Sequence, residues 1–586
     1  MKAIKSISIK KNLAPLILGI AIIILFASIV LFFREDREQH QYDVLSVCES
    51  IPEPFFSVPE GIYDKVFELE INAQPDYDIY YTTNGSTPTT NSQMYKKPIL
   101  VNPNKNLNKD ILYISTSPKW KPPYGRQNHC SVIRARCFKK GVGYGPVKNV
   151  VYCTPDIEKH SGFHIVHLLV ENDSLFSPAR GIYVMGQRYY NKKAIKYFPQ
   201  RRETPNSWRR YPANYRERGW RWTRHGAQFI LMNPTGETVF EQNVSYRMSG
   251  NTSQAYPHKP LRILPDNKSD TIIRYHFFDE LTYPSYKILV RNAGGDAQFA
   301  LLRDAMMNEM VKGTGIDTRA YVPSVVYING NYWGIHNIRE RSDQYYLSAK
   351  YDIPLQNISR ISYRRLNSQN FDLKKIARFR WGPDSAHVSF VNLFNFIQQN
   401  SMADHEAYIY VTTQIEIDNF IDYIIFQTFF VNSGWGRSNV KFYRFEKQIE
   451  TMKENGIDAL KWRWLFCDFD FAMEAPKTFG YNMFKILQNN YPEDITTQMI
   501  FRLMENMEFK EKFISRCEYL MRNNLSTESM LEHINQFEAR YQSEIKRHIA
   551  RWRMPIDYQF WQQEIEYLKV FAHKRQDIYL QQIKSL

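Results

Sequence analysis

The distribution of apolar and polar residues divides the chain into four kinds of segment. Residues 13–33 form an apolar run without a charge, and residues 34–50 are polar. From residue 51 to 153 apolar and polar positions alternate in short runs, as in strands with one buried face. From about residue 384 apolar residues recur every three or four positions, which predicts helices. The pattern predicts a multi-domain protein with an N-terminal transmembrane helix, a small all-β sandwich and an α+β domain with a helical C-terminal lobe.

The apolar run of residues 13–33 is long enough to cross a bilayer, which takes about 20 residues in a helix. Four lysines lie within residues 1–12 and mixed charges follow the run, so the positive-inside rule predicts a cytoplasmic N-terminus. A cleaved signal peptide is the alternative, but the run exceeds the usual length of about 7–15 residues and no A-x-A site follows it. We expect a single-pass membrane anchor, a tether over residues 34–50, and an exported remainder.

Residues 51–153 have the pattern of a small β-sandwich. In VFELEI, Phe67, Leu69 and Ile71 alternate with glutamates, and SVIRARCF at residues 131–138 alternates in the same way. This predicts one core face and one solvent-exposed face. The intervening YYTTNGSTPT resembles the Y-Y-T-x-D-G-S-x-P-T pattern of the chitobiase/β-hexosaminidase C-terminal module, with Asn84 in place of the acidic residue. The resemblance implies an immunoglobulin-like module that is either a spacer or a glycan-binding unit.

Four of the six cysteines lie in or beside this module, where an oxidising compartment would allow disulfides: Cys48, Cys130, Cys137 and Cys153. A bond between Cys130 and Cys137 is unfavourable, because their odd separation within one strand places them on opposite faces. A bond between Cys48 and Cys153 would join the two ends of the module. No C-x-x-C pair is present, so no thiolate zinc site is predicted.

The aromatic run WRWLFCDFDF at residues 462–471 predicts a buried strand that ends in Asp468 and Asp470. Buried carboxylates are unfavourable unless they are paired or bind a metal, and residues two apart in a strand share a face. Both carboxylates are therefore expected to reach one cation, with Asn439 as a neutral third ligand. Oxygen ligands of this kind suit a Mg²⁺ ion that holds nucleotide phosphates. The alternative is a solvated turn at the end of a strand.

A second candidate for phosphate binding is the sequence YRMSGNTSQAYPHKPLRI, which places Gly250, Ser253 and Lys259 between two strand-like runs. Small residues allow backbone N–H groups to approach phosphate oxygens, and a lysine on the next strand can neutralise them. The alternative is that Lys259 is a surface lysine at a strand edge.

Residues from about 163 to 586 resemble the CotH family of spore-coat protein kinases, which are atypical kinases. The resemblance rests on six motifs in the order of the family: HIVHLLVENDSLFSPARGIYVMG, RMSGNTSQAYPHKPLRI, ILVRNAGGD, VVYINGNYWGIHNIRERSD, NSGWGRSNVKFYR and WRWLFCDFDF. It implies an atypical protein-kinase-like domain over residues 154–586 in a bacterial cell-envelope protein. It also implies use of ATP with Mg²⁺ or Mn²⁺.

The resemblance implies a nucleotide-binding set and a metal-binding set: Gly250, Ser253, Lys259 and Glu340 for the nucleotide, and Asn439 and Asp468 for the metal. Glu340 is expected either to pair with Lys259, as a lysine–glutamate pair does in kinases, or to lie at a hinge. Relatives commonly carry N-x-D where this chain reads Asn432-Ser433-Gly434, and glycine cannot accept a proton. Either Asp470 or another carboxylate serves as the catalytic residue, or the protein is a pseudokinase or binding scaffold.

The chain carries a formal net charge of +16, which favours acidic partners. Eight arginines interleaved with aromatic residues between residues 201 and 224 are typical of a surface that binds nucleic acid, an acidic protein or an anionic glycan. An exported protein meets little nucleic acid, so we expect no nucleic-acid partner and a protein substrate that is acidic. The alternative is a loop solvated by its own charges.

Overall fold

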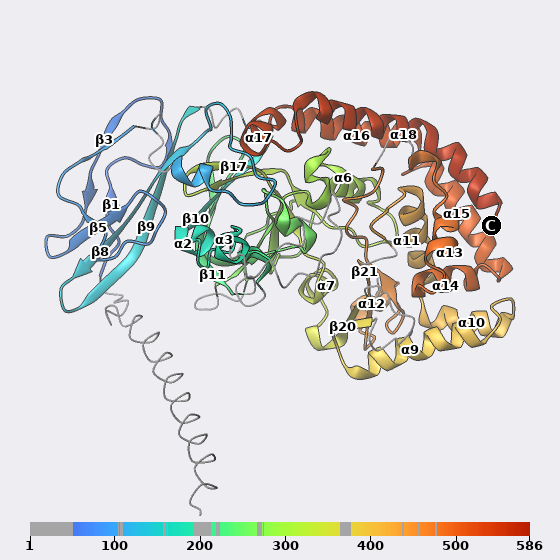
Figure 1. The fold of residues 1–586 in the computed structure, drawn as a ribbon. Coiled ribbons are helices and arrows are strands. Elements are labelled where there is room, and N and C mark those ends of the chain that lie inside the picture. Colours follow the sequence, from blue (N-terminus) through green and yellow to red (C-terminus); the bar gives the residue numbers. More distant parts are fainter. Residues whose placement is uncertain are drawn as a thin grey trace, which may run out of the picture.

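The computed structural model describes residues 51–586, except for residues 103–104, 106–108, 156–159, 161, 191–211, 218–222, 267–271, 274, 364–376, 436–438, 455 and 475–477. A β-rich module, a central sheet and a helical region follow one another in space (Figure 1). The predicted multi-domain organisation, with a β-rich N-terminal module and a helical C-terminal region, is confirmed. The predicted anchor at residues 13–33 lies outside the described residues, as does most of the arginine-rich stretch. Among the described helices, none combines the length and the apolar composition needed to cross a bilayer.

The N-terminal module contains a five-stranded sheet in the order β2-β9-β8-β5-β6 and two short strand pairs, β1 with β4 and β3 with β7. Its strands are β1 Phe55–Phe56, β2 Gly61–Ile62, β3 Phe67–Leu69, β4 Ile71–Asn72, β5 Asp78–Thr82, β6 Gln93–Met94, β7 Ile99–Val101, β8 Cys130–Lys139 and β9 Gly143–Cys153. Leu69, Ile71, Ile133 and Ala135 meet in its core, because alternate side chains of each strand point inward.

The alternation along β8 predicted one solvent-exposed face, but in the structure that face is covered. Arg134 is buried, and its guanidinium donates to Asn149 Oδ1 at 2.9 Å and to the Gly85 carbonyl at 2.7 Å. Val132 and Val151 on the same face belong to the main hydrophobic core of the following domain. The second domain therefore covers this face, and the module packs directly against it.

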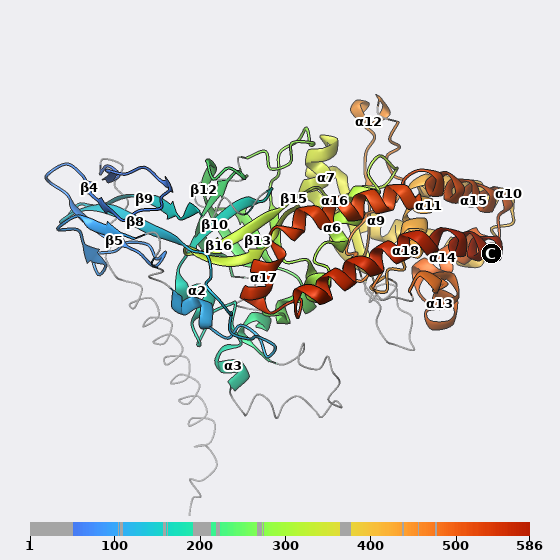
Figure 2. The ribbon, with the colours of Figure 1, turned by 90° about the horizontal axis from the view of Figure 1, so that it is seen from above.

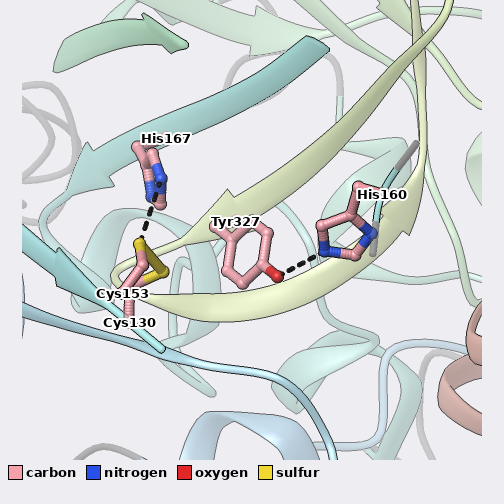
Figure 3. The surroundings of a disulfide bond; sticks show 5 residues. All are labelled: Cys130, Cys153, His160, His167 and Tyr327. Atoms are coloured by element: carbon pink, nitrogen blue, oxygen red, sulfur yellow. Dashed lines mark hydrogen bonds between the residues drawn. A yellow bond between two sulfur atoms is a disulfide. The ribbon is translucent and has the colours of Figure 1, made fainter. Parts of the chain in front are cut away.

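The disulfide in the module joins Cys130 to Cys153, so the suggested bond between Cys48 and Cys153 is wrong. β8 and β9 are antiparallel neighbours, and their register places Cys130 directly opposite Cys153. His167 from the central sheet lies 4.0 Å from the Cys153 sulfur (Figure 3). The remaining described cysteines, Cys137, Cys467 and Cys517, are buried free thiols.

The central sheet has nine strands in the order β15-β18-β14-β13-β12-β11-β10-β16-β17. The strands are β10 His164–Val170, β11 His225–Met232, β12 Thr238–Met248, β13 Leu261–Pro265, β14 Ile288–Arg291, β15 Tyr321–Val322, β16 Ser324–Ile328, β17 Asn331–Ile335 and β18 Asn337–Glu340. β16 and β17 form the predicted hairpin around Asn329-Gly330, where both residues have positive φ.

The two faces of strands β12, β13, β14 and β18 differ in character. One face carries apolar side chains that form a second core with Val244, Tyr246, Ile263, Ile288 and Val290 among its members. Because side chains alternate along a strand, the other face carries the intervening residues. On that face Arg247 lies opposite Arg262, Arg262 opposite Leu289, and Leu289 opposite Arg339.

A smaller sheet and the helical region complete the fold. The sheet has the order β20-β19-β21-β22: β19 Ile358–Tyr363, β20 Ala377–Trp381, β21 Val440–Phe445 and β22 Arg463–Trp464. The longer helices are α6 Arg303–Met310, α7 Gln344–Tyr351, α9 Asp384–Gln399, α10 His405–Gln414, α11 Ile417–Phe429, α13 Met483–Asn490, α14 Ile495–Leu503, α15 Met507–Arg522, α16 Thr527–Gln542, α17 Ile545–Trp552 and α18 Tyr558–Lys584.

Helices α16 and α18 run side by side from the central sheet to the far end of the helical region (Figures 1 and 2). The turn between them is α17, whose Trp552 belongs to the core of the central sheet. Trp561 of α18 donates from its indole to the carbonyl of Ala300, 3.0 Å away. These helices hold the sheet and the helical region in a fixed relation around the segment that carries Asp468 and Asp470.

Candidate functional site

The candidate site forms where β14 of the central sheet meets the segment after β22. Arg291 is the last residue of β14, and its Nη2 donates to Asp468 Oδ1 at 3.1 Å and to Asp470 Oδ1. The structure therefore brings the two predicted carboxylates together on one cationic group. They do not share a strand face, because β22 ends at Trp464 and Asp468 has a left-handed φ of 68°.

A two-glycine turn allows this contact. The 3₁₀ helix η6, Gly294–Gln298, follows β14, and Gly295 N donates to Asp470 Oδ2 at 2.9 Å. A Cβ on Gly294, whose φ is +61°, would lie 1.8 Å from Asp470 Oδ2. A Cβ on Gly295 would lie 2.3 Å from the Phe471 ring. Only glycine allows the turn to approach the carboxylate this closely.

Asp468 and Asp470 differ in how their oxygens are used. Both oxygens of Asp470 accept hydrogen bonds, and burial raises the pKa of Asp470 to about 7 against the opposing effect of Arg291. The Asp468 side chain is 31% exposed. Its Oδ2 accepts no hydrogen bond from a described residue. Asp468 is therefore the carboxylate that can bind a ligand from solution.

Asn439 lies beside Asp468. It precedes β21, and its carbonyl oxygen lies 3.5 Å from the sulfur of Cys467. β21 and β22 pair with Phe442 opposite Trp464, and this register continued outward places Asn439 opposite Cys467. Asn439 and Asp468 therefore lie just beyond the paired part of β21 and β22, both with left-handed φ, 75° and 68°, and a carboxylate with an amide oxygen is a donor set suited to Mg²⁺.

Asp304, in the first turn of α6, contacts the backbone between the two site carboxylates. It is buried, and its oxygens accept from Arg319 at 2.8 and 2.9 Å and from the backbone N–H of Phe469 at 3.0 Å. Arg339 lies 3.1 Å away. Although burial acts in the opposite direction, the surrounding arginines hold the pKa of Asp304 well below its usual value. Asp304 therefore fixes the backbone between Asp468 and Asp470 as a permanent anion.

The sheet face that carries Arg291 is strongly basic. Arg262 is one diagonal step from Arg291, since it pairs with Leu289 two residues earlier on β14, and Arg247 lies directly opposite Arg262. Burial together with Arg341 and Arg247 lowers the pKa of Arg262 to about 8. No described residue accepts a hydrogen bond from its guanidinium, and its Nε is inaccessible to solvent. Like charges placed opposite one another destabilise a sheet, so this face is suited to an anion.

A cleft at the other end of β14 continues the basic face. It is lined by Tyr283, Tyr286, Lys287, Arg341 and Tyr345 together with neighbouring residues. The Lys287 ammonium lies 3.3 Å from the centroid of the Tyr345 ring. Burial lowers the pKa of Lys287 to about 8. The cleft also contains the carboxyl groups of Glu340 and Asp343, and Asp343 pairs with Arg341 at 3.1 Å. It lies about 13 Å along the strand from Arg291 at the usual rise per residue.

Lys259 lies elsewhere than the sequence suggested. It is completely buried, and its ammonium donates to the carbonyls of Gln254 at 2.7 Å and Tyr256 at 2.6 Å, with the Tyr215 ring 4.0 Å away. Burial lowers its pKa well below the usual value. In this position Lys259 holds the preceding loop together, and it is separated from solvent and from the basic sheet face.

Gly250 and Ser253 belong to that loop. Gly250 has a φ of +76°, and a Cβ there would lie 2.1 Å from Ser253 Oγ. The loop reaches the carboxylate site through Asn292, whose side-chain amide donates to the carbonyl of His258. The structure thus brings the glycine- and serine-containing loop next to η6, while the side chain of Lys259 points away.

Glu340 does not pair with Lys259. Its carboxylate accepts from the Ala320 N–H and from the Tyr283 hydroxyl, both at 2.9 Å. Burial raises its pKa to about 7. Glu340 ends β18 at the aromatic cleft, so the expected pair with Lys259 is not formed, and the alternative position at a hinge stays a prediction.

Arg291 and Arg262 belong to motifs that carry the family resemblance, and Arg291 forms ion pairs, but neither was assigned to the site from the sequence. Gly294, Gly295 and Arg247 were not singled out, although a basic residue before a glycine pair in ILVRNAGGD is a signal for a close approach to an anion. Arg262 was hidden by its neighbour Lys259, because the register that decides which residue faces the site is not visible in the sequence.

The site thus holds two aspartates of one segment against a basic sheet face, between a β-rich part and a helical part. Residues 246–579, more than half of the chain, match the family model described as CotH kinase protein. The chain belongs to the CotH kinase family, and it is an atypical kinase-like protein. Residues 67–152 match the model described as Fn3 associated. Both resemblances stated above, to CotH and to an immunoglobulin-like module, are thereby confirmed. No curated protein matches the chain.

Proposed function

We propose that the protein is an exported, membrane-tethered kinase that transfers phosphate from ATP to a protein of the cell envelope. One observation carries the proposal. Arg291 brings Asp468 and Asp470 together at the edge of a basic sheet face whose Arg262 has no described hydrogen-bond acceptor. Phosphoryl transfer depends mainly on positioning and on neutralising phosphate charge, and this arrangement offers both.

Asp468 Oδ2 and the Asn439 amide are the groups that would hold a divalent cation, Mg²⁺ or Mn²⁺. Both offer an oxygen ligand, both reach solvent in part, and they lie just beyond the paired part of β21 and β22, so they fit a hard cation. When bound, the cation supplies charge neutralisation at the phosphates. Asp470 has both oxygens engaged, so its role in this proposal is to orient Arg291 and the η6 turn.

The triphosphate is proposed to lie along the basic face, with Arg291 and Arg262 close to it. Arginine donates several hydrogen bonds in a fixed plane and binds phosphate oxygens in pairs. The nucleoside would then lie at the mouth of the cleft at Lys287 and Tyr345, where its base can stack on an aromatic ring. In this proposal Arg262, and not Lys259, neutralises the phosphates. Gly250 and Ser253 would cover the phosphates from the adjacent loop.

A second candidate function is a pseudokinase or scaffold that binds nucleotide or peptide without transfer. It is favoured by Gly434, which supplies no carboxylate, and by the engagement of both Asp470 oxygens. The membrane location in either case rests on the 21 uncharged residues at 13–33. The expectation that the protein partner is acidic rests on the net charge of +16.

The test is transfer of labelled γ-phosphate by the full-length protein in detergent, with Asp468→Asn as the variant. Asparagine retains an oxygen that can accept from Arg291 but loses the charge that binds a cation. We expect transfer by the parent and at least 100-fold less by the variant. Asp458→Asn, which removes a surface carboxylate paired with Lys461, is the matched control and should leave transfer unchanged. ATP binding without transfer by the parent would favour the pseudokinase, and no ATP binding would refute the kinase and the pseudokinase and leave a peptide-binding scaffold.

A further inference from the structure

We propose that Glu474 is the residue that orients the acceptor hydroxyl and takes its proton during transfer. The inference rests on the proposed kinase function and names a catalytic residue for it. Glu474 lies four residues after Asp470, on the segment that leaves the carboxylate site.

The loop after α11 connects Glu474 to the metal-binding carboxylate. Asn432 Nδ2 donates to the backbone carbonyl of Asp468 at 3.3 Å. The next residue, Ser433, donates from its N–H to the Phe471 carbonyl at 3.1 Å and from its hydroxyl to Glu474 Oε2 at 2.8 Å. Two consecutive residues therefore hold Asp468 and Glu474, so the Glu474 carboxylate has a defined position beside the site.

Among the described carboxylates of this site, Glu474 is the one that is neither paired with an arginine nor assigned to the cation. Asp470 is engaged by Arg291 and Gly295, and Asp304 is enclosed by arginines. Asp468 is assigned to the cation. Glu474 is partly exposed, and no basic side chain in the described part of the chain forms an ion pair with it. Its Oε1 therefore remains free to accept a hydrogen bond from a hydroxyl group that enters from solvent.

Gly434, the next residue of the loop, has no side chain and lies against Asn432 and Phe471. A Cβ on Gly434 would lie 3.2 Å from Asn432 Oδ1 and 3.7 Å from the Phe471 ring. The Gly434 N–H donates to Asn432 Oδ1 at 3.1 Å, which keeps the loop in this conformation. The same distances show that a small side chain can be accommodated at this position with only a slight shift of Asn432.

The proposed transfer forms one bond to phosphorus and breaks another. The acceptor oxygen forms a bond to the γ-phosphorus while the bond from that phosphorus to the β–γ bridging oxygen breaks, and ADP leaves with the electron pair. The hydroxyl proton passes to Glu474 Oε1 and then to solvent. General bases of this kind contribute about 10²–10⁴-fold to a rate.

The experiment measures transfer from γ-labelled ATP with Mg²⁺ by the full-length protein, using dephosphorylated casein as an acidic acceptor and also recording self-phosphorylation and ATP hydrolysis. Glu474→Gln should lower kcat for transfer by about 100-fold while the KM for ATP and the stabilisation by ATP remain unchanged. Ser433→Ala, which releases the carboxylate from its hydrogen bond, should lower kcat by about 10-fold. Glu493→Gln, an exposed glutamate outside the site, is the matched control.

A rescue separates a catalytic role from a structural one. Aspartate introduced by Gly434→Asp into the Glu474→Gln variant would place a new carboxylate on the same loop, and should restore kcat by at least 10-fold. Unchanged kcat in Glu474→Gln would overturn the role of Glu474 and leave the kinase proposal standing. A parent protein that binds ATP but phosphorylates neither casein nor itself, and does not hydrolyse ATP, would overturn both.

Discussion

Replacement of Arg262 by methionine tests whether the basic sheet face is an anion-binding site. Arg262 lies opposite Arg247 and diagonal to Arg291, and no described group accepts a hydrogen bond from it. Removing one of two like charges in direct cross-strand contact should stabilise the protein without ligand by about 0.2–1 kcal/mol. Loss of a hydrogen bond between a charged donor and phosphate should weaken ATP binding by about 1.5–3 kcal/mol, or about 10- to 150-fold in Kd.

The two effects have opposite signs, which makes the variant informative. Thermal unfolding without nucleotide and titration with ATP and Mg²⁺ measure them separately, and raising the salt concentration should weaken binding less in the variant than in the parent. Arg136→Met is the matched control, since Arg136 is a half-buried arginine stacked 4.3 Å from the Tyr144 ring in the N-terminal module. A variant at position 262 that is less stable than the parent and binds ATP equally well would refute the assignment.

Two further predictions concern the turn at the carboxylates and the buried glutamate. Gly294→Ala should reduce ATP affinity by at least 10-fold in titrations, because its Cβ would lie 1.8 Å from Asp470 Oδ2. The control is Gly313→Ala, at a φ of +77° with nothing within 4 Å of the added Cβ. It should lower the free energy of unfolding by only the backbone strain of about 1–2 kcal/mol and leave ATP binding unchanged. Burial raises the pKa of Glu340 to about 7 from a usual 4.5, so the folded state holds a proton that the unfolded state has lost, and stability should fall by on the order of 1–3 kcal/mol as pH rises from about 4.5 through 7. Unfolding of Glu340→Gln across this range should lack that decrease, and an equal decrease in the variant would exclude Glu340 as its source.

Local features were predictable from the sequence because their causes are local. The Asn329-Gly330 hairpin, the alternation of Leu69 and Ile71 into the module core and the helical spacing after residue 384 each depend on residues close in the chain. The pairing of Arg291 with Asp468 and Asp470 depends on contacts across 177 and 179 residues. No periodicity within a short window reports such a contact, so the sequence could give the two carboxylates but not the arginine that joins them.

The expectation that Lys259, and not Arg262, binds phosphate has a different cause. The two residues are three apart, so in extended chain they point to opposite faces of the sheet. A lysine is the more familiar phosphate ligand, and the sequence offered no means of deciding which face of β13 would be turned to the carboxylates. The register of β12, β13 and β14 decides it, because Arg247, Arg262 and Arg291 then lie on one face and the apolar residues between them form the core.

The boundary of the family match also differs from the boundary of the fold. The match begins at residue 246, yet β10 and β11 precede it and lie between β12 and β16 in the nine-stranded sheet. A chain cut at residue 246 would lose β10, β11 and residues 238–245 of β12, and would leave unpaired edges on β16 and on the rest of β12 in the middle of the sheet. β10 in turn carries His167 against the disulfide of the N-terminal module (Figure 3), and Val132 and Val151 of the module share the main core. The module therefore shares a core with the kinase-like domain, and its removal would expose Val132, Val151 and their partners in that core.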